Sequence, residues 1–259
     1  MLDCGGNQLT TLDIKNLSAI KYLTCQFNQL NSLDASLNIS LESLACGGNQ
    51  FTTLDISGNR SLKNLFCYSN RLTTLDVSKN ILLEYLRCDD NLLTTIDLSE
   101  NLALIYLDCS HNQLTNLDLS KNTALRSLLC ESAHLNSIDI TNNINLDYFR
   151  CRDNQLSSLD VSRNNYLSVL WCDNNQLTTL DIHNLTGLSV LICRGNNLKS
   201  LDISNNHSLG TLSWNCSLDI SEMPSLTKVC VWTMPFPPEG MKLCTDSSPN
   251  LYFTNNCSN

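Results

Sequence analysis

Residues 62–80 read LKNLFCYSNRLTTLDVSKN, and this stretch contains the two patterns that decide the fold. Its first half follows LxxLxCxxNxL and its second half follows LxxLDΦSxN, where Φ is an aliphatic residue. Apolar side chains alternate at the centre of both halves, as Leu65 and Cys67 do, and this two-residue period is that of a strand. The unit therefore predicts two short extended segments and no amphipathic helix.

The same unit recurs along most of the chain. Ten of the 14 cysteines recur at a constant spacing of 21 residues, as Cys4 and Cys25 do. A fixed period of this kind indicates a solenoid, in which each unit buries its apolar face against its neighbours. The periodic cysteines are Cys4, Cys25, Cys46, Cys67, Cys88, Cys109, Cys130, Cys151, Cys172 and Cys193.

The LxxLxCxxNxL pattern resembles the leucine-rich repeat, and the resemblance covers residues 1 to about 214. The short unit and its LxxLDΦSxN half are similar to the repeats of bacterial secreted or surface proteins of the internalin type. The resemblance implies a mostly β fold: a right-handed leucine-rich-repeat solenoid with a parallel inner sheet, short outer strands or turns, and little or no helix. We expect residues 1–214 to form about ten such units, with the N-terminus cut within a repeat.

The periodic cysteines are expected to be buried small apolar residues of the inner strands. Zinc requires four ligands that converge on one point, and thiols in a single file do not converge. A disulfide between neighbouring units requires Cβ atoms that point toward each other, whereas in-register strands direct them the same way. These cysteines therefore favour packing over metal binding or redox chemistry.

A column of asparagines follows the cysteines, three residues after each of them. A side-chain amide can pair with turn backbone groups that stacking would otherwise bury without a hydrogen bond. Ala133 interrupts the column, so we expect a local defect or a water molecule there. The column consists of Asn7, Asn28, Asn49, Asn70, Asn91, Asn112, Asn154, Asn175 and Asn196.

Eleven aspartates form an outer column in the second half of the unit. Without them, the 16 basic residues would face 14 acidic residues, so the negative charge belongs to the scaffold and does not indicate a cationic partner. We expect them to accept hydrogen bonds in Asx turns, with calcium binding as the alternative. They are Asp13, Asp34, Asp55, Asp76, Asp97, Asp118, Asp139, Asp160, Asp181, Asp202 and Asp219.

The positions one before, one after and three before each periodic cysteine vary in residue type, unlike the rest of the unit. They are rich in aromatic and arginine residues, which are enriched in interface hot spots. We interpret them as a partner-binding surface on the inner face; the alternative is that they only stack on one another along the sheet. The candidate residues are Tyr22, Phe66, Tyr68, Tyr85, Arg87, Asp89, Tyr106, Asp108, Glu131, Tyr148, Arg150, Arg152, Trp171, Asp173 and Arg194, with aliphatic Leu129, Val169 and Ile192 at equivalent positions.

Several functional classes find no support in the sequence. The four histidines fall at unrelated positions of the repeat, and no HExxH, GxSxG or glycine-rich phosphate loop occurs, so we expect no enzyme, cofactor or metal site. The net charge of −9 argues against nucleic-acid binding. No apolar run approaches the roughly 20 residues of a membrane-spanning helix, so we expect no membrane insertion.

The repeat fails after Leu212. Trp214 takes the place of the next cysteine, and the following unit is four residues short before Leu218-Asp219-Ile220-Ser221. Residues 215–259 are predicted to form a truncated last repeat and a cap, similar to the terminal caps of bacterial repeat proteins. Four cysteines of this segment allow three pairings, and a disulfide would favour an oxidising compartment. They are Cys216, Cys230, Cys244 and Cys257.

These observations favour a non-catalytic module that recognises a protein through its inner, concave face. The resemblance implies an extracellular or cell-surface bacterial protein that binds a host or neighbouring protein. One alternative is glycan binding, in a groove centred on Trp171 with Arg150, Arg152 and Asp173. Another is a passive spacer that presents a further domain. The sequence leaves the partner and the oligomeric state open.

Overall fold

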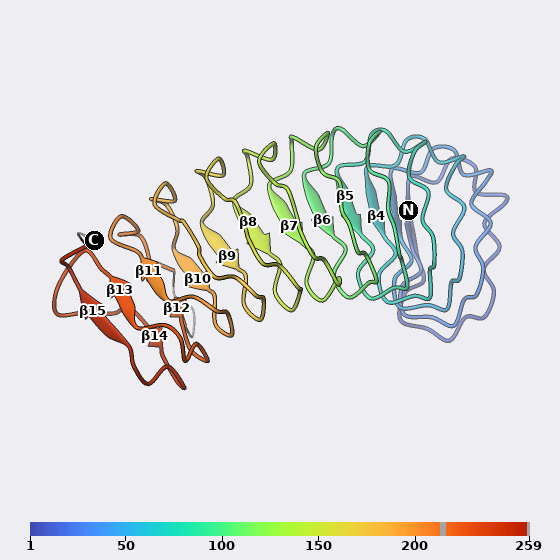
Figure 1. Ribbon diagram of the computed structural model, residues 1–259. Coiled ribbons are helices and arrows are strands. Elements are labelled where there is room, and N and C mark those ends of the chain that lie inside the picture. The colour runs from blue at the N-terminus through green and yellow to red at the C-terminus, as the bar shows by residue number, and fades with distance from the viewer. Residues whose placement is uncertain (213–215, 258–259) are drawn as a thin grey trace. The chain divides into compact units, whose positions relative to one another are not determined.

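The structure is a computed structural model and describes residues 1–212 and 216–257. These residues form short parallel strands joined by turns, and none of them is helical. The chain divides into two compact units, Met1–Leu125 and Arg126–Asn259. Within each unit, successive coils stack side by side with their strands aligned (Figure 1).

The first unit contains six inner strands, each paired in parallel with the next. The same step along the chain joins every pair, so that Leu23 opposes Leu44 and Leu44 opposes Leu65. Equivalent side chains therefore form rows across the sheet. The strands are β1 (Leu2–Asp3), β2 (Tyr22–Thr24), β3 (Ser43–Ala45), β4 (Asn64–Phe66), β5 (Tyr85–Arg87) and β6 (Tyr106–Asp108).

The second unit begins in the same way and then acquires a second sheet. β7 (Ser127–Leu129), β8 (Tyr148–Arg150), β9 (Val169–Trp171) and β10 (Val190–Ile192) pair in order. β12 (Leu218–Asp219) and β14 (Leu243–Cys244) extend this inner sheet. The outer halves of the last coils form a separate three-stranded parallel sheet of β11 (Ser200–Asp202), β13 (Lys228–Cys230) and β15 (Tyr252–Thr254). The predicted mostly β solenoid with short outer strands or turns is thus confirmed.

Leucine and cysteine side chains fill the core of the coils. The prediction of buried cysteines is confirmed, because the nine from Cys25 to Cys193 are fully buried free thiols and Cys4 is partly buried. Burial raises the pKa of Cys25 and of Cys67 to about 12. These thiols therefore stay protonated at neutral pH and behave as small apolar side chains.

The asparagine column pairs with backbone as predicted. Asn49 donates from Nδ2 to the carbonyls of Cys25 and Cys46, both at 3.0 Å, and its Oδ1 accepts the Leu30 N–H at 3.0 Å. The expected defect at Ala133 is present in the backbone, since His134 adopts positive φ there; positive φ at Ser132 is regular, because Ser69 and Asp90 at the equivalent position have it too. The neighbouring Asn154 accepts the N–H groups of Ala133 and Leu135.

A second asparagine column, in the outer half, was not predicted. Asn59 is fully buried and donates to the carbonyls of Ala35 and Asn38, each at 3.0 Å. The last position of LxxLDΦSxN carries the signal, because it recurs with the same period as the first column. The fully buried members are Asn38, Asn59, Asn80, Asn101, Asn122, Asn143, Asn164 and Asn206.

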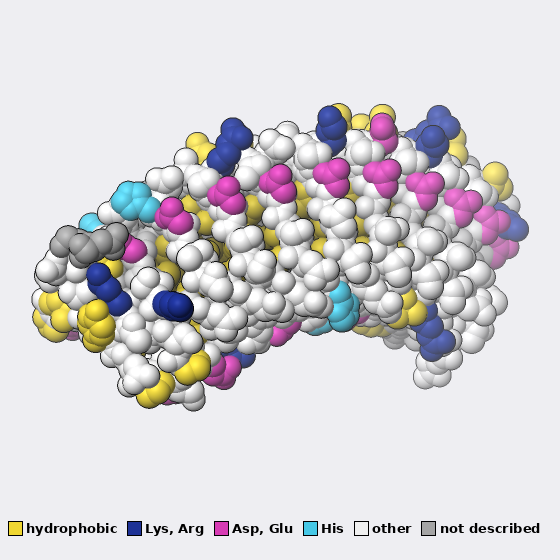
Figure 2. Space-filling view, viewed as in Figure 1, with side chains coloured by type: hydrophobic (Ala, Val, Ile, Leu, Met, Phe, Trp, Pro, Cys, Tyr) yellow, Lys and Arg dark blue, Asp and Glu magenta, His cyan; other side chains and the backbone are white. Residues whose placement is uncertain are grey.

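The aspartate column forms the predicted Asx turns. Asp55 Oδ1 accepts the Ser57 N–H at 3.0 Å and the Ser57 hydroxyl at 2.7 Å. These two hydrogen bonds lower the pKa of Asp55. Acidic side chains form a regular row on the surface (Figure 2).

Asp219 was wrongly assigned to that outer column. It opposes Ile192 in the inner sheet, whereas Asp202, the preceding outer aspartate, opposes Cys230. Both halves of the repeat share a Leu-x-apolar core, so the Leu218–Ile220 stretch fits either half, and the irregular spacing after Leu212 places it in the inner one. Trp214 and the expected boundary at 214/215 lie outside the described residues.

Candidate binding surface

Alternation along the inner strands separates core from surface. In β5, Tyr85 is exposed, Leu86 is buried and Arg87 is half-buried. The side chains one before, one after and three before each periodic cysteine therefore lie on the side of the sheet opposite the leucine and cysteine core. We call this side the strand face; all fifteen candidate residues occupy such positions, eight in the first unit and seven in the second.

A charged cluster on the strand face of the first unit surrounds Arg87. Its Nε and Nη2 donate to the two carboxylate oxygens of Asp89 at 3.1 and 3.0 Å, and Nε lies 3.7 Å from Asp108. The guanidinium lies over the Tyr68 ring, 4.4 Å from its centroid. Burial, together with the charge of Asp89, raises the pKa of Asp108 to about 6.

Aromatic residues of this unit also contact one another. The rings of Tyr85 and Tyr106 stack with centroids 6.2 Å apart, and Phe27 meets Tyr68 edge-on at 6.1 Å. Tyr22 is exposed, and its hydroxyl donates to Glu42 at 3.3 Å. Stacking along the sheet, the alternative to a binding role, therefore occurs for some of the candidate residues.

The strand face of the second unit centres on Arg150 and Trp171. The guanidinium of Arg150 on β8 lies 3.6 Å from the centroid of the Trp171 ring on the adjacent strand β9. Glu131 pairs with Arg150 at 3.7 Å and with Arg152 at 3.2 Å. One face of the Trp171 indole is therefore covered by the Arg150 guanidinium, and Arg150 is fixed in turn by its ion pair with Glu131.

A hollow of about 340 Å³ opens beside this pair. Asp173 at its floor is only 2% exposed, and burial raises the pKa of its carboxyl to about 6. Arg194 lies 3.8 Å from Asp173 and 3.7 Å from Glu222, distances of ion pairs without close hydrogen bonds. The hollow is lined by Arg152, Trp171, Asp173, Ile192, Arg194, Cys216 and Asp219.

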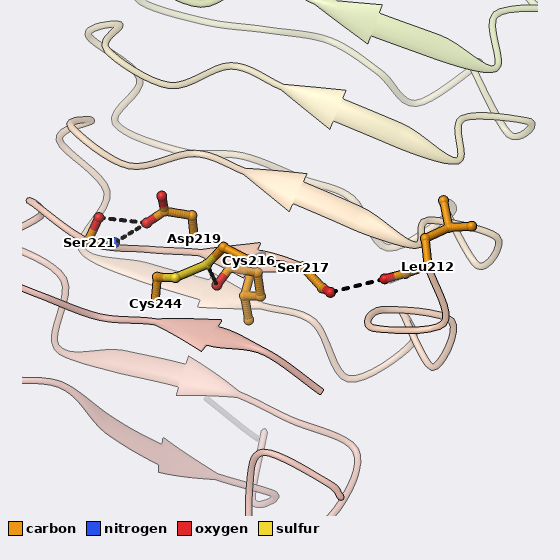
Figure 3. Close-up of a disulfide and its surroundings, with 7 residues drawn as sticks. Leu212, Cys216, Ser217, Asp219, Ser221 and Cys244 are labelled. Carbon is orange, nitrogen blue, oxygen red and sulfur yellow. Dashed lines mark hydrogen bonds between the residues drawn. A yellow bond between two sulfur atoms is a disulfide. The ribbon is translucent and has the colours of Figure 1, made fainter. Parts of the chain in front are cut away.

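The C-terminal coils complete this hollow. Cys216 forms a disulfide with Cys244, and Asp219 lies close to it, with its Oδ1 accepting the Ser221 N–H at 3.0 Å and the Ser221 hydroxyl at 2.6 Å (Figure 3). A second disulfide joins Cys230 and Cys257. The sequence had left three pairings open. Sequence reasoning also missed Asp219 as a residue of the inner sheet that lines the hollow, although the shortened unit before it signalled a change of register.

Histidines and potential metal ligands can be located among the described residues. The four histidines are exposed, as expected. Among the described residues, one group of three metal-ligating side chains has its ligand atoms within 4.8 Å of one another, namely Asp202, Cys230 and Cys257, and the two cysteines are joined in the disulfide. No helix that is long and apolar enough to cross a membrane occurs in the described part of the chain.

Comparison with solved structures finds similar solenoids in bacterial proteins. The functional domain of InlJ from Listeria monocytogenes, which includes a cysteine ladder, is 30% identical with a TM-score of 0.82, over 91% of this chain and 55% of that one. A leucine-rich-repeat protein of Leptospira interrogans is 27% identical with a TM-score of 0.72, over 75% and 54%. YopM from Yersinia enterocolitica is 25% identical with a TM-score of 0.68, over 95% and 55%.

The chain spans about half the length of these structures. No protein-family model and no curated protein sequence matches it.

Proposed function

Because this chain is a leucine-rich-repeat protein similar to the internalin type, we propose that it is a non-catalytic module that binds a protein partner through its strand face. The observation that carries the proposal is the Arg150 guanidinium stacked 3.6 Å from the Trp171 ring, beside a hollow of about 340 Å³. A large aromatic side chain next to a concavity is typical of the centre of a protein interface.

The surroundings of Trp171 support this role. A side chain that is already ordered loses little conformational entropy when a partner binds, so more of its contact energy contributes to affinity. Arg150 holds one face of the ring, and Glu131 in turn pairs with Arg150 at 3.7 Å. The proposal extends to all fifteen candidate residues: the eight on the strand face of the first unit and the seven on that of the second are each proposed to contact a partner.

We propose an extracellular or cell-surface location. The Cys216–Cys244 and Cys230–Cys257 disulfides support it, because such bonds persist in oxidising compartments. The periodic thiols are compatible with that setting, since those from Cys25 to Cys193 are buried away from oxidants.

Glycan binding is the second candidate. The hollow combines the Trp171 indole with the Asp173 carboxylate and two arginines, groups that can stack on a sugar ring and bind its hydroxyls. A glycan would occupy the hollow alone, whereas a protein would also cover the neighbouring strands. The passive-spacer alternative predicts no ligand on this face at all.

Arrays of extracellular proteins and of glycans, probed with the purified chain, separate these candidates. Once a ligand is found, Arg150→Ala and Trp171→Ala are expected to weaken its binding at least tenfold without moving the unfolding midpoint. Asp118→Ala and Asp139→Ala, in outer turns, serve as controls that lower stability and spare affinity. If a protein partner is found and the Arg150 and Trp171 variants bind it normally, the strand-face assignment is wrong.

A further inference from the structure

The lining of the hollow in the second unit is balanced, with Asp173 and Asp219 against Arg152 and Arg194, and the excess of negative charge comes from the carboxylates that surround it. Five carboxylates surround it or pair with its arginines, those of Glu131, Asp153, Asp173, Asp219 and Glu222, against the guanidinium groups of Arg150, Arg152 and Arg194. Each of the three arginines has a carboxylate within 4.0 Å. The local balance is therefore two negative charges in excess, which favours a cationic occupant.

Two of these carboxylates, those of Asp173 and Asp219, line the hollow itself. No cationic side chain among the described residues forms an ion pair with Asp219, and both hydrogen bonds from Ser221 reach the same oxygen, Oδ1. Asp173 Oδ1 is buried without a hydrogen-bond partner, and Arg194 approaches the other oxygen only to 3.8 Å. An arriving cation thus meets two carboxylates: that of Asp219, which is half-buried, and that of Asp173, whose negative charge is buried and only weakly neutralised by Arg194.

The walls suit a flexible apolar stem. Trp171 and Ile192 come from adjacent strands β9 and β10 and oppose each other in register. A lysine presents a compact ammonium on four methylene groups, which can lie against such a wall while the charged end reaches a carboxylate. The guanidinium of an arginine is larger and planar, so it fits less readily than the compact ammonium between two carboxylates. An acidic group would meet the excess negative charge.

We infer that this hollow receives the ammonium group of a lysine side chain of the protein partner, held between the Asp173 and Asp219 carboxylates with its methylene groups against Trp171 and Ile192. The inference rests on the proposed protein-binding function and specifies the chemistry of the partner at one point. It makes Asp219, which is contributed by the irregular C-terminal coils, a binding residue.

A cation at this position also couples binding to protons. The groups that act on the Asp173 carboxyl are the cations of Arg152 and Arg194, the anion of Asp153 and the surrounding burial, and together they raise its pKa to about 6. A bound ammonium favours the charged carboxylate and lowers this pKa. Binding is therefore strongest above pH 6 and weakens as the pH falls through that value.

The test uses a small probe, so that it does not depend on finding the partner. Nα-acetyl-lysine methylamide is titrated into the ¹⁵N-labelled protein while the Trp171 indole N–H signal is followed. Its norleucine analogue has the same stem without the ammonium, and a methyl glycoside represents the sugar alternative. We expect a saturable shift with the lysine probe, at least fivefold weaker binding at pH 5 than at pH 7.5, and no saturation with the other two.

Variants make the test specific. Asp219→Asn and Asp173→Asn are expected to weaken the lysine probe at least fivefold, and Asp173→Asn removes most of the pH dependence. Asp202→Asn is the matched control, because Asp202 forms the same Asx turn with Ser204 at 2.9 Å but lies in the outer sheet. Unfolding midpoints of all three variants establish that the fold is retained.

Three results would overturn the inference: equal binding of the lysine and norleucine probes, normal binding by Asp219→Asn, or saturation by the glycoside alone. The proposed function fails separately. A protein partner that depends on Arg150 and Trp171 while the lysine probe does not bind refutes only the inference. If the lysine probe binds but partner affinity is unchanged in Arg150→Ala and Trp171→Ala, only the proposed partner-binding site on the strand face is refuted.

Discussion

The charged cluster around Arg87 in the first unit and the one around Trp171 in the second are built from the same strand positions. They differ in how closely their charged side chains pair with one another. In the first unit every strand follows its neighbour at the same step, and Arg87 makes two hydrogen bonds of about 3 Å to Asp89. In the second, Leu191 opposes Leu218, although one regular step would reach Leu212, and Arg194 holds its carboxylates at 3.7–3.8 Å. The departure from the repeat coincides with the hollow.

The difference indicates what repetition does to a surface. Where the register is constant, each side chain has an equivalent neighbour at the spacing of adjacent strands, and charged groups can pair with one another. Where a coil of different length follows, the pairing is incomplete and a concavity remains. We therefore expect the repeats to supply a stable scaffold, and the irregular coils to supply the specific site.

The largest expected effect tests the shared core of the two units. Leu86 and Leu170 are fully buried, so Leu86→Ala and Leu170→Ala should each lower the free energy of unfolding by about 2–5 kcal/mol. Stability in stacked coils is a nearest-neighbour sum, so the loss should be partly local. Thiol labelling measures this: Leu86→Ala should increase the reactivity of Cys67 and Cys88 more than that of Cys172.

Thr94→Ala is the control for both core variants. Thr94 is exposed, and its loss should change the free energy of unfolding by less than about 0.5 kcal/mol. In the unmutated protein, Cys25 through Cys193 should resist thiol reagents until the chain unfolds. If Thr94→Ala is as destabilised as the leucine variants, the assignment of core and surface positions is wrong.

The second prediction separates the two units. Replacing Cys216 and Cys244 together by serine removes a crosslink that spans 28 residues and should cost about 2–4 kcal/mol. The loss should be confined to the second unit, as amide hydrogen exchange would show, and should shift the Trp171 indole signal because Cys216 lines the hollow. Replacing Cys230 and Cys257, whose disulfide is outside that lining, should destabilise the C-terminal coils without this shift.

Much of the fold could be predicted from the sequence because each unit is encoded locally. The strand of Leu65 and Cys67 has its partners one repeat away on either side, so a single repeat defines the register of all regular coils. The placement of Arg150 and Trp171 on one side of the inner sheet followed from the same rule. The division of the chain into residues 1–214 and 215–259 remains a prediction.

The sequence failed where the period failed. The Leu218–Ile220 stretch matches the outer half of the repeat, but its position is decided by which neighbouring strand it can reach, and that depends on the whole irregular loop before it. The burial of Asp108 and Asp173 was also missed. The pattern places both on the surface side of the strands, whereas both are buried, with Arg87 3.7 Å from Asp108 and Arg194 3.8 Å from Asp173.

The third prediction concerns Asp108, the buried carboxylate of the first cluster. Its pKa in the folded protein is raised from 3.8 to about 6 by burial and by the charge of Asp89. The folded state therefore binds this proton more tightly than the unfolded state, and the resulting stability is present below about pH 4 and is lost as the pH rises through 6. Relative to Asp108→Asn, the free energy of unfolding of the unmutated protein should fall by about 3 kcal/mol at most as the pH rises from 4 through 6.

Urea unfolding of both proteins at several pH values between 4 and 7.5 measures this difference. The slope of the difference against pH is the informative quantity, because Asp108→Asn also changes the contacts with Arg87 and Ser110 at every pH. A difference that does not vary with pH would mean that Asp108 titrates normally and that the cluster around Arg87 is open to water.

The smallest expected effect has the opposite sign and tests whether the outer column differs in kind from the strand face. Asp97 is exposed, and the backbone N–H and hydroxyl of Ser99 lower its pKa below 3.8. The folded state here binds the proton less tightly than the unfolded state, so the stability from Asp97 is present above about pH 4 and is lost as the pH falls through the lowered pKa. Asp97→Asn should therefore be slightly less stable than the unmutated protein at pH 7, and the difference should shrink as the pH falls through the lowered pKa.

Because solvent screens an exposed carboxylate, the stability difference for Asp97 should be smaller than that for Asp108. It should decrease toward low pH, where the Asp108 difference is greatest. Two variants with slopes of the same sign would show that the outer and strand-face carboxylates share one environment, and the contrast between scaffold and site would then fail.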